Sequence, residues 1–150
     1  MDMQLVYGIC HNVVKLEEHK VDGKKRQVYV HRKGATRSFP GQPVLVAGSM
    51  GTASYVLKGQ QGAMDKTFGS SAHGAGRAMS RHGALRKWRG EDIQKELAAR
   101  NITAKSNHPS SLAEEAPLAY KDVDEVIESI HGAGVSSKVV RLVPLGVIKG

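Results

Sequence analysis

The sequence predicts an α+β fold, a mixed sheet with packed helices, on the basis of two observations. Short segments in which apolar and polar residues alternate are interspersed with longer segments whose apolar residues recur at helical spacing. The chain has 150 residues, of which 40% are hydrophobic, and this is enough for one domain with a real core. We therefore expect residues 1–150 to form one domain, or part of one, without a second domain.

The first half is expected to begin with a helix and to continue with strands. Apolar residues recur at helical spacing over Met3–His19, and Asp2 can cap this helix. The turn residues Asp22–Gly23 precede the alternating segment Gln27–His31, which predicts a strand. Two further strands are expected at Val44–Ala47 and Ser54–Leu57.

The second half is expected to be mostly helical. Helical patterns cover Ala75–Trp88, Glu91–Arg100 and Asp122–His131, and Gly90 separates the first two. The segment Asn101–Ser111 is rich in Ser, Asn and Pro, so we expect an exposed loop there. A closing strand is expected at Lys138–Val143.

Charge and cysteine content narrow the class of protein. The formal net charge of +8 favours polyanionic partners through counterion release, although a solvated basic face on a thermostable protein explains it equally well. The single cysteine, Cys10, cannot form an intrachain disulfide, which indicates a reducing compartment and a core position. No apolar run reaches the length of a membrane span, and the start of the chain lacks a signal pattern. We expect a cytoplasmic protein without membrane association.

The segment Ser70–Arg81, SSAHGAGRAMSR, carries the residues of a phosphoryl-transfer site. Gly74 and Gly76 can take positive φ and let backbone N–H groups approach an anion. A helix beginning at Ala75 would attract phosphate at its N-terminus, disfavour the imidazolium form of His73 and leave a nitrogen lone pair able to attack phosphorus. On that helix Arg77 and Arg81 would share one face. The alternative is a glycine-rich helix cap with a solvent-facing histidine.

Three other segments accompany this one in a fixed order. They are HRKGATR at His31–Arg37, GQPVLVAGSMGTASYVL at Gly41–Leu57 and GVIKG at Gly146–Gly150. Together with SSAHGAGRAMSR they resemble the C-terminal part of the RtcB RNA-splicing ligases. The resemblance covers this whole chain and roughly the last third of the family's length.

The resemblance implies an RNA ligase that uses GTP and manganese. Such an enzyme joins RNA 3′-phosphate or 2′,3′-cyclic phosphate ends to 5′-hydroxyl ends in tRNA splicing and RNA repair. It does so through a guanylylated histidine, and His73 matches that nucleophile. An N-terminal portion of the family supplies most manganese ligands, and no residues of this chain match it. The expected partners are tRNA halves or broken RNA ends, an archease-like activator and a separate N-terminal chain.

The resemblance also assigns a nucleotide pocket and a metal ligand. In the segment Cys10–Asn12 the histidine, His11, would bind manganese and approach the nucleotide with Asn12; from the residues alone, His11 is more simply a half-buried structural histidine. Tyr120 would stack on guanine, or else pack at a helix start, and Lys149 would contact guanine or phosphate, or else be a solvated terminal charge. From the residues alone, the loop Gly48–Ser54 lacks a Walker A pattern and is more often a tight strand connection than a site. The remaining pocket residues that the resemblance assigns are Ala47, Gly48, Ser49, Met50, Ser54, His73, Gly74, Ala75 and Gly76.

The basic segments have two interpretations. Arg32, Lys33 and Arg37 are suited to contact RNA phosphates, but so many cations close together also mark a solvated loop. A second basic stretch, Arg81–Arg89, contains Trp88, which is expected to be a core or interface anchor. Between Arg37 and Gly41 the chain has only SFP, where relatives carry a longer connection.

Three function classes therefore stand beside each other. The first is the nucleophile-bearing, GTP-binding segment of an RtcB-like RNA ligase. The second is an inactive truncated or split fragment that acts at most as a basic nucleic-acid-binding module. A structural remnant that needs a partner chain for any function is a third.

Overall fold

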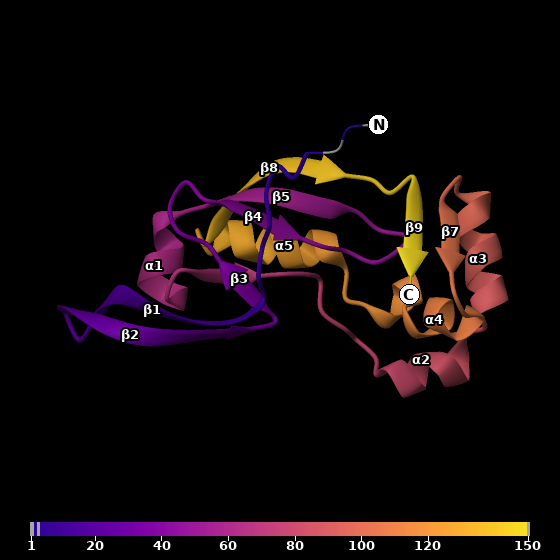
Figure 1. Ribbon diagram of the computed structural model, residues 1–150, viewed down its shortest axis with the longest axis horizontal. Helices are drawn as coiled ribbons and strands as arrows, with labels where there is room; N and C mark the ends of the chain where they lie inside the picture. Colours follow the sequence, from indigo (N-terminus) through magenta and orange to yellow (C-terminus); the bar gives the residue numbers. More distant parts are fainter. Residues whose placement is uncertain (1, 3, 150) are drawn as a thin grey trace.

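The computed structural model describes residue 2 and residues 4–149, and it confirms the α+β class. The strands are distributed over several small sheets rather than gathered in one, as Figure 1 shows. A long antiparallel hairpin projects at one end of the molecule, and a three-stranded antiparallel sheet, order β4-β5-β8, lies at its centre. In chain order the strands are β1 (Asn12–Val21), β2 (Lys24–Lys33), β3 (Ala35–Arg37), β4 (Pro43–Val46), β5 (Ser54–Gly59), β6 (Ser70–Ala72), β7 (Thr103–Ser106), β8 (Ser136–Leu142) and β9 (Gly146–Lys149).

The helices are short, and they differ in where they lie relative to the central sheet. Helix α5 covers one face of that sheet, whereas α2, α3 and α4 gather at the far end with the parallel pair β7 and β9 (Figure 1). No helix among the described residues is both long and apolar enough to cross a membrane. The helices are α1 (Gln61–Thr67), α2 (Arg81–Lys87), α3 (Gly90–Ala99), α4 (Pro109–Glu114), the 3-10 turn η1 (Pro117–Ala119) and α5 (Val123–Gly132).

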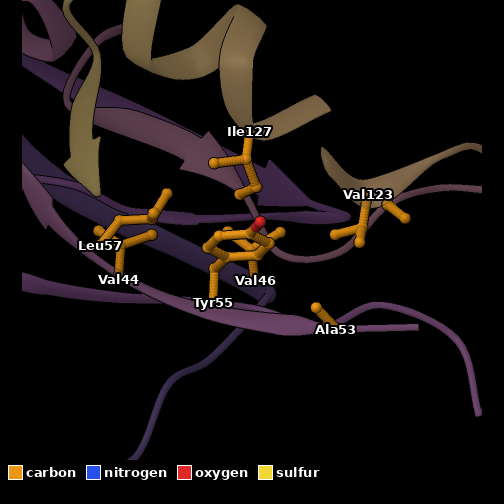
Figure 2. Packing of buried hydrophobic residues seen from close by; sticks show 8 residues of the cluster. Val44, Val46, Ala53, Tyr55, Leu57, Val123 and Ile127 are labelled. Atoms are coloured by element: carbon orange, nitrogen blue, oxygen red, sulfur yellow. The ribbon is translucent and has the colours of Figure 1, made fainter. Parts of the chain in front are cut away.

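The first hydrophobic cluster joins the central sheet to α5. Alternate residues of β4 and β5 point to the same face, and Val123 and Ile127, one helical turn apart, close over them. The ring of Tyr55 lies in the middle of this packing (Figure 2), while its hydroxyl donates to Asp124 at 2.6 Å. The members are Val44, Val46, Ala53, Tyr55, Leu57, Ala75, Val123 and Ile127.

A second cluster holds the far end together. Ile93 and Leu97 of α3 pack against Leu112 of α4 and the start of β7. Trp88 packs against this cluster from the segment before α3, so the expectation of a core anchor is confirmed. The side chain of Met50 is also buried here, 2% exposed.

The expected helix over Met3–His19 is wrong: residues 4–11 are neither helix nor strand, residues 12–19 lie in β1, and Met3 itself lies outside the described residues. Asp22 and Gly23 both have positive φ and form the tight turn that joins β1 to β2. In the hairpin the apolar Val14 and Leu16 are exposed, whereas Glu17 and His19 are buried. The apolar spacing was misleading because this strand buries its polar face. The strand expected at Gln27–His31 is confirmed within β2.

Three other expectations are wrong, two of them in the second half of the chain. Only Arg81–Lys87 of the predicted helix Ala75–Trp88 is helical, because Ser80 caps the helix by accepting a hydrogen bond from the Gly83 amide. The expected loop Asn101–Ser111 contains β7 and the start of α4. Cys10 is exposed rather than in the core. The strands expected at 44–47, 54–57 and 138–143 are confirmed as β4, β5 and β8, and the helices expected at 91–100 and 122–131 as α3 and α5, with small shifts of their ends.

A buried ion pair attaches the hairpin to the rest of the fold. Arg32, 1% exposed, donates to both carboxylate oxygens of Glu17, at 2.9 and 2.7 Å. Its guanidinium also donates to the Ser70 hydroxyl and to the carbonyls of Phe68 and Gly69. The expected contact of Arg32 with RNA phosphate does not fit this arrangement, because the side chain is enclosed and its donors are used within the chain.

We predict that Arg32→Met destabilises the chain by about 3–5 kcal/mol, because Glu17 is then left buried without its partner. Urea unfolding followed by circular dichroism measures the change. Arg26→Met, an exposed position on the same strand, is the matched control and should change stability by no more than about 0.5 kcal/mol. Unchanged stability in Arg32→Met together with loss of RNA affinity would restore the phosphate-binding interpretation.

The same ion pair predicts an acid-sensitive stability. Burial raises the pKa of Glu17, but hydrogen bonds from Arg32 and His19 outweigh it and hold the pKa below the ordinary 4.5. The stabilisation is therefore complete above pH 4.5 and is lost as the pH falls through the lower pKa of the folded state. In Glu17→Gln the free energy of unfolding should depend less steeply on pH in this range. An identical slope in both proteins would contradict this account.

Candidate active site

Three chain segments, each just after the end of a strand, meet around His73. The backbone carbonyl of His73, just after β6, accepts from the amide of Ala47, just after β4, at 3.1 Å, and the carbonyl of Ala47 accepts from the Ala75 amide at 2.9 Å. The amide of Gly34, just after β2, donates to the carbonyl of His11 at 2.9 Å. Backbone hydrogen bonds thus join residue 11 to residue 34 and residue 47 to residue 73, and the side chain of His73 links these two pairs. We call His11, Gly34 and His73 the histidine cluster.

The imidazole of His73 is oriented from two sides. Its Nδ1 lies 2.7 Å from the carbonyl oxygen of Gly34. Because a carbonyl only accepts, this contact requires the hydrogen on Nδ1, and in the neutral ring it leaves the lone pair on Nε2. The ring of His11 stacks on His73 with 4.6 Å between centroids and an interplanar angle of 23°. The helix N-terminus expected beside His73 is absent, because residues 75–80 are not helical, and the ring is oriented by the Gly34 carbonyl instead.

Gly34 does not stand out in the sequence, yet it contacts both histidines. Its amide holds the backbone of His11 and its carbonyl holds the side chain of His73. It has φ +66°, a left-handed conformation that favours glycine. The sequence signal was the lone glycine between the cations of HRKGATR.

The loop that follows β4 stabilises itself through its hydroxyls. The Ser49 amide donates to Thr52 Oγ1 at 2.7 Å and the Gly48 amide donates to Ser54 Oγ at 3.3 Å. A Cβ at Gly48 would lie 1.9 Å from the Ala53 carbonyl oxygen, so only glycine fits there. A hydroxyl that accepts from an amide keeps its own hydrogen to donate, so Thr52 and Ser54 can still donate to a ligand. The side chain of Met50 faces the core instead.

A second group of polar side chains surrounds Glu115, which follows α4. Its carboxylate accepts from the Tyr120 hydroxyl, from Arg77 Nη1 at 3.3 Å and from Lys149 Nζ at 3.5 Å. Arg81 Nε lies 3.6 Å away. We call these five residues the Glu115 cluster. Arg77 and Arg81 do not share a helical face as expected, because Arg77 precedes α2, yet both reach the same carboxylate.

The Glu115 cluster shifts the acidities of its members. Burial raises the pKa of Glu115, but the hydrogen bond from Tyr120 and the charges of Lys149 and Arg77 outweigh it, so this pKa is lowered. Burial and the neighbouring carboxylate raise the pKa of Tyr120. The carboxylate is therefore ionised and the phenol protonated near neutral pH.

The remaining expected residues lie around these two groups. Asn12 is exposed at the start of β1, Gly74 forms a bridge with Ala47, and Ala75 is buried in the first hydrophobic cluster. Gly76 has φ +74° and its carbonyl accepts from the Lys121 amide at 3.0 Å. The chain from 74 to 77 thus connects the histidine cluster to the Glu115 cluster.

Two cavities adjoin these groups. One, of about 380 Å³, is lined by Tyr120 together with Gly51 and Thr52 of the loop after β4. The other, of about 390 Å³, is lined by Lys15, Arg37 and Gln42, beside the segment that carries His11. Arg37 donates to Gln42 at 3.1 Å, and Lys33 is exposed at the end of β2.

The described residues do not form a metal site by themselves. Within residues 2 and 4–149, no three histidine, cysteine, aspartate or glutamate side chains are grouped closely enough to hold a metal ion. His11 is the residue that the family resemblance assigns to manganese. The donors among the described residues do not complete a coordination sphere.

We predict that Gly34→Ala disturbs His73, because alanine at φ +66° is strained by about 1–2 kcal/mol and the peptide plane that holds Nδ1 shifts. The added Cβ would lie 3.6 Å from His73 Cε1, an ordinary contact, so the strain comes from the backbone. The ¹⁵N resonances of His73 should show the Nδ1–H tautomer in the unaltered chain and a mixture in the variant.

The matched control is Gly23→Ala, which puts a similar strain, at φ +77°, in the turn of the β1–β2 hairpin. It should lower stability comparably and leave the His73 resonances unchanged. If both variants keep the same tautomer, Gly34 does not orient the ring.

Comparison with known proteins assigns the chain to a family. A family model described as tRNA-splicing ligase RtcB matches residues 1–150. The chain is 53% identical to the tRNA-splicing ligase RtcB of Thermococcus kodakarensis over 163 aligned positions, which cover all of this chain and 34% of the relative. It is 51% identical to the RtcB of Archaeoglobus fulgidus, again covering 34% of that protein, and 52% identical to the RtcB of Methanocaldococcus jannaschii, covering 17%.

The chain thus spans about a third or less of the length of these curated relatives. The identity is high and extends along the entire chain, so the match is not confined to one motif. This chain belongs to the RtcB family of tRNA-splicing ligases.

Proposed function

We propose that this chain carries the nucleophile and part of the guanosine-binding site of an RtcB-type RNA ligase. The ligase would join RNA 3′-phosphate or 2′,3′-cyclic phosphate ends to 5′-hydroxyl ends in tRNA splicing and RNA repair, in the cytoplasm. The observation that carries the proposal is the 2.7 Å contact of His73 Nδ1 with the Gly34 carbonyl, which directs the lone pair to Nε2. Family membership supplies the reaction class.

In the first step, His73 Nε2 attacks the α-phosphorus of GTP. A nitrogen–phosphorus bond forms, the bond from that phosphorus to the bridging oxygen breaks, and pyrophosphate leaves. The stacked ring of His11 and the Gly34 carbonyl keep the imidazole from rotating, so less orientation is lost on reaching the transition state.

In the later steps the guanylyl group activates RNA. An oxygen of the RNA 3′-phosphate attacks the guanylyl phosphorus and releases Nε2, and the 5′-hydroxyl of the second RNA then attacks the RNA phosphate and releases GMP. Arg81, whose side chain is 64% exposed, is available to bind these phosphates. Arg77 donates mainly within the chain, to Met79, Glu114, Glu115 and Tyr120, and we assign it to shaping the pocket.

The guanosine would lie between the loop after β4 and Tyr120. Both line the same cavity, and Tyr120 offers an aromatic ring for stacking while Lys149 offers a cation. The proposed nucleotide-binding set keeps Ala47, Gly48, Ser49 and Ser54 on the loop side. For Met50 we propose only a backbone contribution, because its side chain is buried in the second hydrophobic cluster.

Manganese enters the proposal through His11 alone. Since the described residues do not complete a metal site, we route no step through the metal. The other ligands would come from residues outside this chain, either in a longer polypeptide or in a separate N-terminal chain.

RNA binding would use the cationic surface near His11. Lys33, Arg37 and Lys15 lie at the hairpin base or in the adjoining cavity, and the net charge of +8 favours a polyanion. The RNA partners would be tRNA halves or broken RNA ends, and an archease-like activator is a further proposed partner.

One observation favours a second candidate function. The chain spans only 17–34% of the relatives' length and its described residues do not form a metal site, so an inactive fragment that binds nucleic acid through its basic surface would have the same sequence features. Formation of a covalent adduct separates the two candidates.

We predict that the chain, incubated with radiolabelled GTP and manganese together with the missing portion of an RtcB, forms an adduct that is acid-labile and alkali-stable, as a phosphoramidate should be. His73→Ala should lower the adduct yield by at least about a hundredfold, because the attacking nitrogen is gone. Thermal unfolding should change little, since the partly exposed ring packs mainly on His11.

His82→Ala is the matched control, because His82 is an exposed histidine on α2 outside both clusters. It should retain the full yield. An undiminished adduct yield in His73→Ala would contradict the assignment of His73 as the nucleophile. If the unaltered chain forms no adduct but still binds RNA, the second candidate is favoured.

A further inference from the structure

Glu115 belongs to none of the sequence motifs, and the family resemblance assigns it no role. It follows α4, and its side chain is only 18% exposed. Oε2 accepts from Tyr120 and Lys149, while Oε1 accepts from Arg77 and lies 3.6 Å from Arg81. One carboxylate thus connects side chains from the segment before α2, from α2 itself, from the residue after η1 and from the end of β9.

Tyr120 is fixed at its hydroxyl and on one face. Its hydroxyl donates to Glu115 and accepts from Arg77 Nη1 at 3.1 Å. The guanidinium carbon of Arg77 lies 4.8 Å from the centre of the Tyr120 ring, in cation–π contact. The ring therefore has a set orientation before any ligand arrives.

Lys149 depends on the same carboxylate. It is the last residue of β9, a strand that pairs only with β7 among the described residues, and its ammonium contacts Glu115. Three cations converge here, from Arg77, Arg81 and Lys149, and they would repel one another without a central negative charge. The lowered pKa of Glu115 agrees with a carboxylate that stays ionised among them.

We propose that Glu115 is a positioning residue for guanosine recognition: its carboxylate holds Tyr120 and Lys149 in the arrangement in which they bind the guanine of GTP. This inference rests on the proposed function, which places guanine against these two side chains. Glu115 acts through its neighbours and takes no part in the transfer at His73. Its removal should therefore weaken GTP binding and leave the rate of adduct formation at saturating GTP unchanged.

The test compares Glu115→Gln with Glu114→Gln in the 150-residue chain. The variants remove the same charge from adjacent residues, but the Glu114 side chain contacts only Arg81, at 3.7 Å, among the described residues. Titration calorimetry with GTP measures the affinity. We expect it to fall roughly tenfold or more in Glu115→Gln, the loss typical of a hydrogen bond to a charged group, and less than about twofold in Glu114→Gln.

A second variant separates positioning from general damage to the fold. Tyr120→Phe keeps the ring but removes the hydroxyl that Glu115 holds, and its effect on GTP affinity should not add to that of Glu115→Gln in the double variant. A spectrophotometric titration should show one tyrosine ionising at lower pH in Glu115→Gln, because the neighbouring negative charge that raises the pKa of Tyr120 is gone.

The outcomes are distinguishable. Unchanged GTP affinity in Glu115→Gln, or full additivity with Tyr120→Phe, would overturn the positioning role and leave the proposed function intact. Failure of the unaltered chain to bind GTP, alone and with the missing portion of an RtcB, would overturn the proposed function and this inference with it.

Discussion

The Arg32–Glu17 ion pair is the interaction on which the arrangement around His73 depends. It is buried, bidentate and extended by the hydrogen bond from Arg32 Nε to the Ser70 hydroxyl at 2.9 Å, so it ties β2 directly to β6. Gly34 follows Arg32 by two residues and His73 follows Ser70 by three. A contact as short as that between Gly34 and His73 needs both segments fixed, and this ion pair fixes them just before they reach it.

Local pattern predicted the elements whose buried face is apolar. Helices α3 and α5 place Ile93 with Leu97, and Val123 with Ile127, one turn apart, so their periodicity was visible in the sequence. Strand β1 was mistaken for a helix because it buries Glu17 and His19 and exposes Val14 and Leu16, which reverses the signal. The chain from Ala75 to Ser80 is non-helical because Ala75, Arg77 and Ala78 form hydrogen bonds or bridges with distant segments, which local propensity cannot reveal.

Some residues of the candidate site could be identified from the sequence, and others only from the structure. His73 could be singled out from its glycine-rich surroundings, and the resemblance led to Tyr120 and Lys149, but nothing local indicated that Glu115 would connect them. Gly34 and His73 are separated by 39 residues, and Glu115 and Lys149 by 34, so their contacts follow from strand pairing rather than from spacing. Glu115 and Gly34 therefore become part of the site only through the tertiary fold.

The distribution of charge explains how a strongly basic chain can keep distinct roles for its arginines. Arg32 is enclosed with Glu17, and Arg77 is engaged by Glu115 and by backbone carbonyls, so neither contributes a free charge to the surface. Arg81 and Lys33 are exposed and keep donors available to solvent and to polyanions. An arginine whose guanidinium is already bonded on its edges fixes geometry, whereas one with open donors can follow a moving phosphate. In this chain, burial and internal hydrogen bonds therefore separate Arg32 and Arg77, which hold the fold together, from Arg81, whose guanidinium remains open to solvent.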